Sequence, residues 1–425
     1  MRAPRPFVLL SWIGLASVAS AQSVEFSANH VFLSDFGLKQ IVEFDESGAF
    51  VRAIDLSTGP NIVPTGLAFG PEGLLHIGSG LSTSIVAIDG TGEVAATATN
   101  PAILNVEAVE FDTLGRYLVT SYNFGDLIRM PLDGSSATVL YDGTTPLYDL
   151  EIDDFGFIVT SPGALGQTRF FEVDGTGTLS NATSLGFVSG GVFPHGAAVE
   201  FGGTLVVSDS AHPRVISGTS WIGAVPDTID VPLATGPIED VDFAPDGRLL
   251  LVDSTQGRIV AVGPDGESEV FASSPNSPPY AVYLAVAPFR FDTIVRGRVR
   301  DGSGAMVQIL ESAVVSIQPA SRRVMFRFTD DPEQADDFVS VTGIDRLVAN
   351  GKVTGIGAPG PLRSIHARAP RDALSRNDVT VTCDTKRKFD EAGFERVISA
   401  SGSLWCGGSD SQIHLTFKTK KVLNP

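Results

Sequence analysis

The 425-residue sequence is poor in sulfur. It has two cysteines and four methionines. A zinc ribbon, an iron–sulfur cluster or a multiply cross-linked scaffold would need more thiolate groups than this. Charged residues make up only 19% of the chain and hydrophobic residues 43%. This composition excludes a disordered protein, and the chain is long enough to bury a substantial core.

Basic residues are scarce in the first two thirds of the chain. Residues 1–288 hold 10 basic and 33 acidic residues, whereas residues 289–425 hold 20 basic and 16 acidic residues. This change in charge predicts a domain boundary near Pro288. Because an acidic surface repels phosphate backbones, we expect the larger part not to bind nucleic acid.

Long apolar runs are absent beyond the N-terminus, so we expect no transmembrane helix. At the N-terminus, two arginines precede the short apolar run FVLLSWIGLASV at residues 7–18, and the small residues ASA follow at 19–21. This pattern predicts a signal peptide over residues 1–21, cleaved near Ala21, and a secreted or periplasmic protein. In such an oxidising compartment we expect Cys383 and Cys406 to form a disulfide.

A unit of about 40–50 residues recurs between residues 24 and 288. Each copy has a short apolar strand, a tight turn containing glycine, and a second apolar strand that ends in Ser or Asp. The clearest copies are GLAFGPEGLLHIGS (66–79), AVEFDTLGRYLVTS (108–121), DLEIDDFGFIVTS (149–161), GAAVEFGGTLVVSDS (196–210) and DVDFAPDGRLLLVDS (240–254). A third and a fourth strand follow in each copy. Four strands per unit at this period are typical of a β-propeller blade.

The two ends of the repeat region complement each other. The segment HVFLSD (30–35) matches a second strand without a first strand before it, and YAVYLAV (280–286) matches a first strand with nothing after it. We therefore expect an all-β fold: a six-bladed β-propeller over residues 22–288, closed by pairing of these two segments. Such closure removes exposed sheet edges.

Three segments carry a family resemblance. DSTQGRIVAVGPDG (253–266) and DFGLKQIVEFD (35–45) resemble NHL repeats, and PTGLAFGPEG (64–73) resembles the related gluconolactonase/SMP-30 and streptogramin-lyase propellers. The resemblance implies a six-bladed propeller. It leaves the activity open, because this fold hosts many functions.

Residues just before each innermost strand of a propeller point toward its central channel. The repeat alignment places at this position Thr65, Glu107, Tyr148, His195 and Glu239, and the closing strand adds Tyr280. Asp149 and Asp240 follow this position directly and are expected at the border of the channel. Thr65, Tyr148 and Tyr280 are therefore candidate channel-lining binding residues.

The resemblance adds a possible metal site. Streptogramin-lyase-like enzymes use His and Glu from neighbouring blades, and Pro194-His195-Gly196 followed by Glu239 is similar to their pattern. The lactonases place an Asn ligand where this chain has Thr65. Glu107, His195 and Glu239 are thus candidate ligands for one divalent cation, Ca, Mg or Zn. A wet channel of hydrogen-bonded polar side chains is the alternative.

The remaining residues, 289–425, alternate apolar and polar residues over several segments. This pattern predicts a small β-sandwich-like domain. Its basic clusters, at residues 386–388 and 418–421, favour association with an anionic cell envelope.

Two functions fit these features. One is an exported NHL-like propeller that acts as a binding scaffold for a protein or small molecule at one of its faces. The other is a metal-dependent lactonase- or lyase-like enzyme with its site in the channel. The sequence lacks the common hydrolase and phosphate-loop motifs, and the choice between scaffold and enzyme stays open at this stage.

Overall fold

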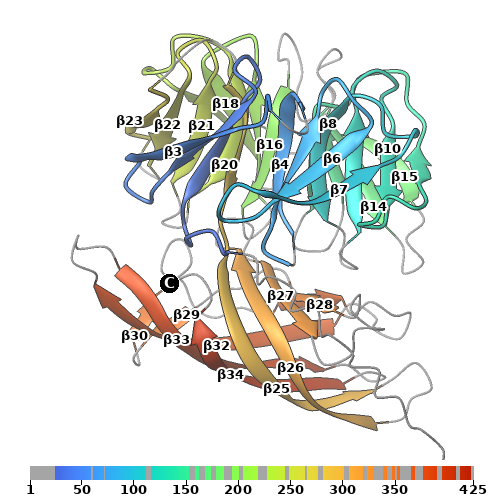
Figure 1. Ribbon diagram of the computed structural model, residues 1–425, viewed down its shortest axis with the longest axis vertical. Helices are drawn as coiled ribbons and strands as arrows, with labels where there is room; N and C mark the ends of the chain where they lie inside the picture. The colour runs from blue at the N-terminus through green and yellow to red at the C-terminus, as the bar shows by residue number, and fades with distance from the viewer. Residues whose placement is uncertain are drawn as a thin grey trace, which may run out of the picture.

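A computed structural model of the chain shows an all-β architecture (Figure 1), with strands and turns but no helix among the described residues. Within residues 24–422 the structure leaves out 59–60, 71, 112–115, 153–157, 162–167, 174–178, 186–193, 201–203, 219–226, 245–247, 264–265, 276–280, 301–305, 319–322, 329–337, 342–346, 350–351, 355–364, 369–376, 390–394 and 408–411. Side chains are described within 24–151, 194–198 and 205–290. The predicted signal peptide, residues 1–21, lies outside the described residues.

Six four-stranded antiparallel sheets contain all strands up to Val286. In order from the innermost strand outward, they are β24 (Ala281–Val286), β1 (Val31–Asp35), β2 (Gln40–Phe44), β3 (Phe50–Asp55); β4 (Pro64–Phe69), β5 (Leu75–Ser79), β6 (Ser84–Ile88), β7 (Val94–Thr99); β8 (Val106–Phe111), β9 (Tyr117–Ser121), β10 (Leu127–Met130), β11 (Thr138–Tyr141); β12 (Asp149–Ile152), β13 (Ile158–Ser161), β14 (Thr168–Val173), β15 (Leu179–Leu185); β16 (Pro194–Glu200), β17 (Thr204–Asp209), β18 (Arg214–Gly218), β19 (Asp227–Asp230); and β20 (Ile238–Phe243), β21 (Leu249–Asp253), β22 (Arg258–Val262), β23 (Ser268–Ser273). We number these sheets as blades 1 to 6 in this order.

The prediction of an all-β propeller is confirmed, and two distant segments share one sheet. β24 pairs with β1 in antiparallel register, with Val31 opposite Val286 and Leu33 opposite Leu284. More than 240 residues separate these partners along the chain. The pairing covers the edge of β1 that β2 leaves free, and β24 becomes the innermost strand of blade 1.

Burial falls from the axis to the rim of each blade. All five residues of β5 are buried, whereas five of the six residues of β7 are exposed. Second strands such as β1 and β5 are buried along their whole length, because neighbouring blades cover both of their faces. One cluster joins Phe32 and Ile41 of blade 1 to Phe69 and Ile77 of blade 2. The core is therefore a ring of interfaces between blades.

The innermost strands share a local irregularity. The pairing register shifts after the first residue of the strand: between Pro64 and Leu67 in blade 2, between Pro194 and Ala197 in blade 5, and at matching points of other blades. Such a bulge frees a backbone N–H and redirects the side chains beside it. These bulge residues lie at the predicted channel positions.

Beyond the propeller, ten further strands pair into one sheet. They are β25 (Phe289–Arg300), β26 (Met306–Gln318), β27 (Arg323–Phe328), β28 (Phe338–Val341), β29 (Leu347–Ala349), β30 (Lys352–Thr354), β31 (Ile365–Arg368), β32 (Asn377–Phe389), β33 (Glu395–Gly407) and β34 (Gln412–Val422). β25 follows β24 almost directly and continues away from the propeller (Figure 1). Strand pairing alone does not test the predicted sandwich, because one sheet can fold over into two layers without any change in its pairing. The sandwich-like arrangement of this region therefore stays a prediction.

The register of this sheet bears on the predicted disulfide. Cys383 lies opposite Gly402, and Cys406 lies opposite Val379, on the adjacent strands β32 and β33. An offset of four residues along a strand spans about 13 Å, whereas a disulfide needs Cα atoms within about 7 Å. This register therefore does not bring the two cysteines together.

The described residues contain no helix with the length and apolar character needed to cross a bilayer.

The first strand beyond the propeller is tied to it by a buried ion pair. Arg290, which is 3% exposed, binds Glu25 near the start of the described chain.

Candidate functional site

The turns that join second to third strands, and the connections between blades, lie on one face of the propeller, which we call the loop face. The innermost strands begin at this face. The predicted channel residues Glu107, Tyr148, His195 and Glu239 lie at or next to those beginnings. We call the region that they form the loop-side mouth of the channel.

Thr65 does not act as a channel-lining group. It is buried, and its Oγ1 donates a hydrogen bond to the carbonyl oxygen of Val106 at 2.6 Å. Val106 belongs to blade 3, so the hydroxyl links two neighbouring blades. Its hydrogen-bonding capacity as a donor is used within the fold.

Tyr280 lies outside the described residues. The pairing of β24 with β1 shows which other residues of β24 correspond to the channel positions of the other blades. Asp35 pairs with Ala281 in blade 1, as Asp209 pairs with Pro194 in blade 5. Val282 is therefore the counterpart of His195, and Tyr283 is the counterpart of the next residue, Gly196.

Tyr283 connects three of the elements around the channel. Its hydroxyl lies 2.7 Å from the carbonyl oxygen of Tyr148 and 3.2 Å from Oε1 of Glu107. Because a tyrosine hydroxyl has one hydrogen, it donates to the closer carbonyl oxygen. Oε1 of Glu107, at the longer distance, is the second acceptor for the same hydrogen.

The protonation state of Glu107 follows from its burial. Burial raises the pKa of Glu107 to about 8, and the carboxyls of Asp149 and Glu239 add to this effect. Its bond with Tyr283 opposes the rise. At pH 7 Glu107 is therefore mainly a neutral acid that can donate a hydrogen bond.

His195 is held in one tautomer. Its Nδ1 lies 2.8 Å from the carbonyl oxygen of Glu239, so Nδ1 carries the hydrogen. Burial lowers the pKa of His195, and the ring is therefore neutral at pH 7. The lone pair of Nε2 then faces the mouth, with Oε2 of Glu239 at 3.5 Å from it.

Aromatic rings enclose this pair of acceptors. The ring of Tyr148 lies 4.4 Å from the ring of His195, and Tyr122 packs edge-on against Tyr148 at 5.5 Å. The ring of Tyr283 lies 5.8 Å from His195 on the channel side. The mouth thus offers two acceptors, Nε2 and a carboxyl group, beside aromatic faces.

The predicted metal ligands do not form a cation site in this arrangement. Glu107 bonds to Tyr283, and one nitrogen of His195 is used by a backbone carbonyl. Within the described part of the chain, no three His, Cys, Asp or Glu side chains gather closely enough to hold a metal ion. We therefore derive no chemical step through a metal.

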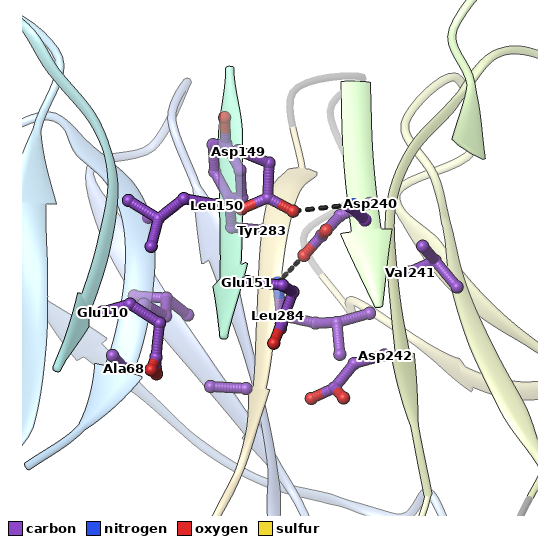
Figure 2. A pocket seen from close by; sticks show the side chains of 14 residues that line it. Ala68, Glu110, Asp149, Leu150, Glu151, Asp240, Val241, Asp242, Tyr283 and Leu284 are labelled. Atoms are coloured by element: carbon purple, nitrogen blue, oxygen red, sulfur yellow. Dashed lines mark hydrogen bonds between the residues drawn. The ribbon is translucent and has the colours of Figure 1, made fainter. Parts of the chain in front are cut away.

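A second polar region lies deeper in the channel, beyond Tyr283. Figure 2 shows the carboxyl groups of Glu110, Asp149, Asp240 and Asp242 around the strand that carries Tyr283 and Leu284. Together with Glu151 they line a cavity of about 40 Å³, which has room for a few water molecules. We call this region the acidic cavity.

Two of these carboxyls link neighbouring blades. Asp149 Oδ2 accepts a hydrogen bond from the N–H of Ala197 at 2.7 Å, and Asp240 Oδ2 accepts one from the N–H of Leu284 at 2.8 Å. The acceptors come from blades 4 and 6, and the donors from blades 5 and 1. The bulges in the innermost strands make these N–H groups available.

Proximity and burial make these acids weak. Burial raises the pKa of Asp149 to about 7, with a further contribution from Glu110. Burial and the carboxyl of Asp149 raise the pKa of Asp240 well above its ordinary value. The acidic cavity therefore holds several protons near neutral pH that free aspartates would release.

Sequence reasoning predicted Glu107, Tyr148, His195 and Glu239, which lie at the mouth, and Asp149 and Asp240, which lie in the acidic cavity. It missed Tyr283 and Tyr122. The strand that carries Tyr283 matches Pro194–Glu200, and this match is the signal that could have found Tyr283. Both strands contain a bulge, which keeps the two in register. Tyr122 follows the Ser that ends the second strand of its blade. The turn that carries it approaches Tyr148, and the repeat contains no counterpart of this contact.

Comparisons with known proteins agree with the fold. No family model and no curated protein sequence matches the chain. A structure described as a nidogen/laminin complex is 16% identical over 61% of this chain and 98% of that chain, with a TM-score of 0.52. This likeness supports the propeller fold alone.

Other similar structures are enzymes. A virginiamycin B lyase from Staphylococcus aureus is 12% identical over 85% of this chain and 97% of that chain, with a TM-score of 0.43. A gluconolactonase from Xanthomonas campestris is 15% identical over 54% and 84%, with a TM-score of 0.44.

Proposed function

We propose that this protein is a ligand-binding propeller whose site is the loop-side mouth. The observation that carries the proposal is the neutral His195, whose Nε2 lone pair faces the mouth next to the carboxyl group of Glu239. Two adjacent acceptors beside the Tyr148 ring suit a ligand that brings hydrogen-bond donors, above all an organic cation. Aromatic faces attract cations, and so does the acidic propeller as a whole.

The six four-stranded sheets support a six-bladed, NHL-like propeller as the scaffold. The N-terminal pattern supports export to a secreted or periplasmic location. The basic clusters beyond residue 385 support contact with the cell envelope, and the acidity of residues 1–288 argues against nucleic acid as a ligand.

Ligand-observed NMR with a panel of small amines and matched neutral amides tests the proposal. We expect saturation transfer to the amines, and a loss of at least about tenfold in affinity for Glu239→Gln and Tyr148→Ala. Asp242→Asn, in the acidic cavity, is the matched control and should bind as the parent does. Equal signals from amines and amides, or equal loss in the control, would contradict the proposal.

The second candidate is a lactonase- or lyase-like enzyme. The perturbed pKa values of Glu107 and His195 favour it, because a protonated carboxyl and a neutral imidazole can act as acid and base at neutral pH. The resemblance of residues 64–73 supports the same class. Metal dependence was part of this prediction, although no three His, Cys, Asp or Glu side chains gather into a metal site among the described residues.

Turnover of a lactone panel, with and without added Ca, Mg or Zn, tests this candidate. If the protein is such an enzyme, it should hydrolyse or open a lactone ring at a measurable rate. Glu107→Gln and His195→Phe should abolish this rate while the thermal unfolding temperature changes little. A rate that both variants retain would contradict a role for the mouth in catalysis.

A further inference from the structure

An apolar arc lies on the loop face over the first three blades. Phe36, Leu38, Leu81, Tyr122 and Phe124 are exposed, and all five lie in turns between a second and a third strand. Leu81 is 68% exposed and Phe124 is 51% exposed. A cluster of exposed large apolar side chains is typical of a binding surface.

The arc is continuous and its backbone is held in place. The N–H of Asn105 donates to the carbonyl of Ser82 at 3.1 Å, and the N–H of Tyr122 donates to the carbonyl of Asn105 at 3.0 Å. These bonds join the turn of blade 2 to the turn of blade 3. On the other side, Phe36 lies against Gly80, at 3.4 Å from where a Cβ atom would stand.

Other exposed large hydrophobic residues are distributed differently. Phe50, Val51, Val94, Val139 and Val270 lie on the outermost strands of four blades. Scattered apolar residues of this kind are normal on a protein surface. The arc differs because it leads into the mouth, where Tyr122 packs against Tyr148.

The charges beside the arc are mainly acidic. Asp142 is exposed, and its charge, together with burial, raises the pKa of the nearby Asp126. The closest bases on this face have partners within the fold. Lys39 bonds to the side chain of Asn61.

Across the propeller the pattern is the same. Arg214 binds Asp209, and Arg258 binds Asp253. Acidic residues outnumber basic residues by 33 to 10 in residues 1–288, and this excess favours a basic partner over an acidic one.

The described strands beyond the propeller lie away from this face. The innermost strand β24 begins at the loop face and ends at the opposite face, where β25 follows it. The strands beyond residue 288 lie on that opposite side (Figure 1).

We propose that the apolar arc docks an extended basic segment of a partner polypeptide. Its apolar side chains cover Leu81 and Phe124, and one of its Lys or Arg side chains enters the mouth toward Glu239. This inference rests on the proposed function of the mouth and adds the class of its ligand. Apolar contacts supply the affinity, and the acidic groups select the charge and speed association.

Fluorescence anisotropy with a labelled peptide of alternating Lys and Leu or Trp residues tests the proposal on the full chain. We expect saturable binding that weakens by about tenfold in Leu81→Ser and in Phe124→Ser. Val94→Ser and Val139→Ser, on the outermost strands, are matched controls and should bind as the parent does. A peptide with Glu in place of Lys should not bind, and added salt should weaken the Lys peptide.

Three results would overturn the proposal. One is no peptide binding while small amines still bind at Tyr148, which leaves the proposed function intact. Another is equal weakening in the Val94→Ser control, which indicates non-specific adhesion. The third is a dimer in sedimentation experiments that Leu81→Ser dissociates, because the arc would then be covered by a second copy.

Discussion

The two polar regions of the channel are built from adjacent positions of the same repeat, yet they differ in chemistry. At the loop-side mouth, one carboxyl bonds to Tyr283 and one imidazole bonds to a backbone carbonyl, which leaves Nε2 of His195 beside the Glu239 carboxyl. In the acidic cavity, carboxyls face one another and bind the N–H groups of the next blade. The first arrangement suits a ligand, and the second stabilises the ring of blades.

Tyr283 separates the two regions, and its removal should have the largest effect. It is 2% exposed, so Tyr283→Ala should destabilise the propeller by about 3–5 kcal/mol through lost burial and a cavity. Tyr283→Phe should cost only about 1–2 kcal/mol, because it loses the hydroxyl bonds alone. Urea unfolding measures both values. Equal losses would show that burial of the ring adds no stability beyond the hydroxyl bonds.

The acidic cavity should make stability depend on pH. The pKa of Asp149 is about 7 in the folded protein, against 3.8 as the reference for the unfolded chain. A folded state that holds the proton more tightly is favoured at low pH, and this stability is lost as pH rises from about 4 through 7. We expect the unfolding temperature to be lower at pH 8 than at pH 5.5.

The variant Asp149→Asn isolates this effect, since an amide oxygen still accepts the Ala197 hydrogen bond. It should be more stable than the parent at pH 8, by up to a few kcal/mol on the scale of about 1.4 kcal/mol per pKa unit. The difference should shrink as pH falls and vanish only below about pH 4, where the unfolded aspartate is protonated as well. Asp133→Asn, at an exposed turn, is the control, and an unchanged pH profile in Asp149→Asn would contradict the role of the cavity.

The spacing of blades near the axis should tolerate no added side chain. A Cβ atom on Gly66 would lie 2.5 Å from Cα of Ala108 and 2.6 Å from the carbonyl oxygen of Glu107. Gly66→Ala should therefore cost about 2 kcal/mol or more by forcing blades 2 and 3 apart. Gly266→Ala meets nothing within 4 Å but has a φ of +82°, so it should cost about 1 kcal/mol. Chemical unfolding of both variants compares the two costs.

Thr65 tests where the mouth ends. Thr65→Val removes the hydrogen bond to Val106 and should destabilise the protein by about 1 kcal/mol. Amine binding at the mouth should not change, because the hydroxyl faces blade 3. A loss of binding without a loss of stability would restore Thr65 as a channel-lining residue.

Much of the fold was predictable because a propeller repeats itself. Strand length, turn glycines and strand-ending Ser or Asp recur in each copy, and the two incomplete copies at residues 30–35 and 280–286 could be matched to each other. The C-terminal region lacks such internal copies, so its strands were predicted without a check on their partners. The offset of Cys383 and Cys406 in the register of β32 and β33 illustrates this difference.

The candidate site was predicted less well, because it depends on details that the repeat does not contain. A bulge in the innermost strand affects which of two adjacent residues enters the channel, as with Tyr283 beside Val282 in β24. A neighbouring carbonyl decides whether a hydroxyl is free, as with Thr65. The tautomer of His195 depends on the backbone of the next blade.

The amino-acid sequence by itself determined the sheet repeat, the pairing of the two chain ends and the acidity of residues 1–288, because periodicity and charge are properties of the chain. Only the tertiary structure decided which side chains meet at the axis, which protons they hold and which apolar turns form one surface. Those properties depend on distances of a few ångströms between blades that lie far apart in the chain, and on the water that packing removes from between them.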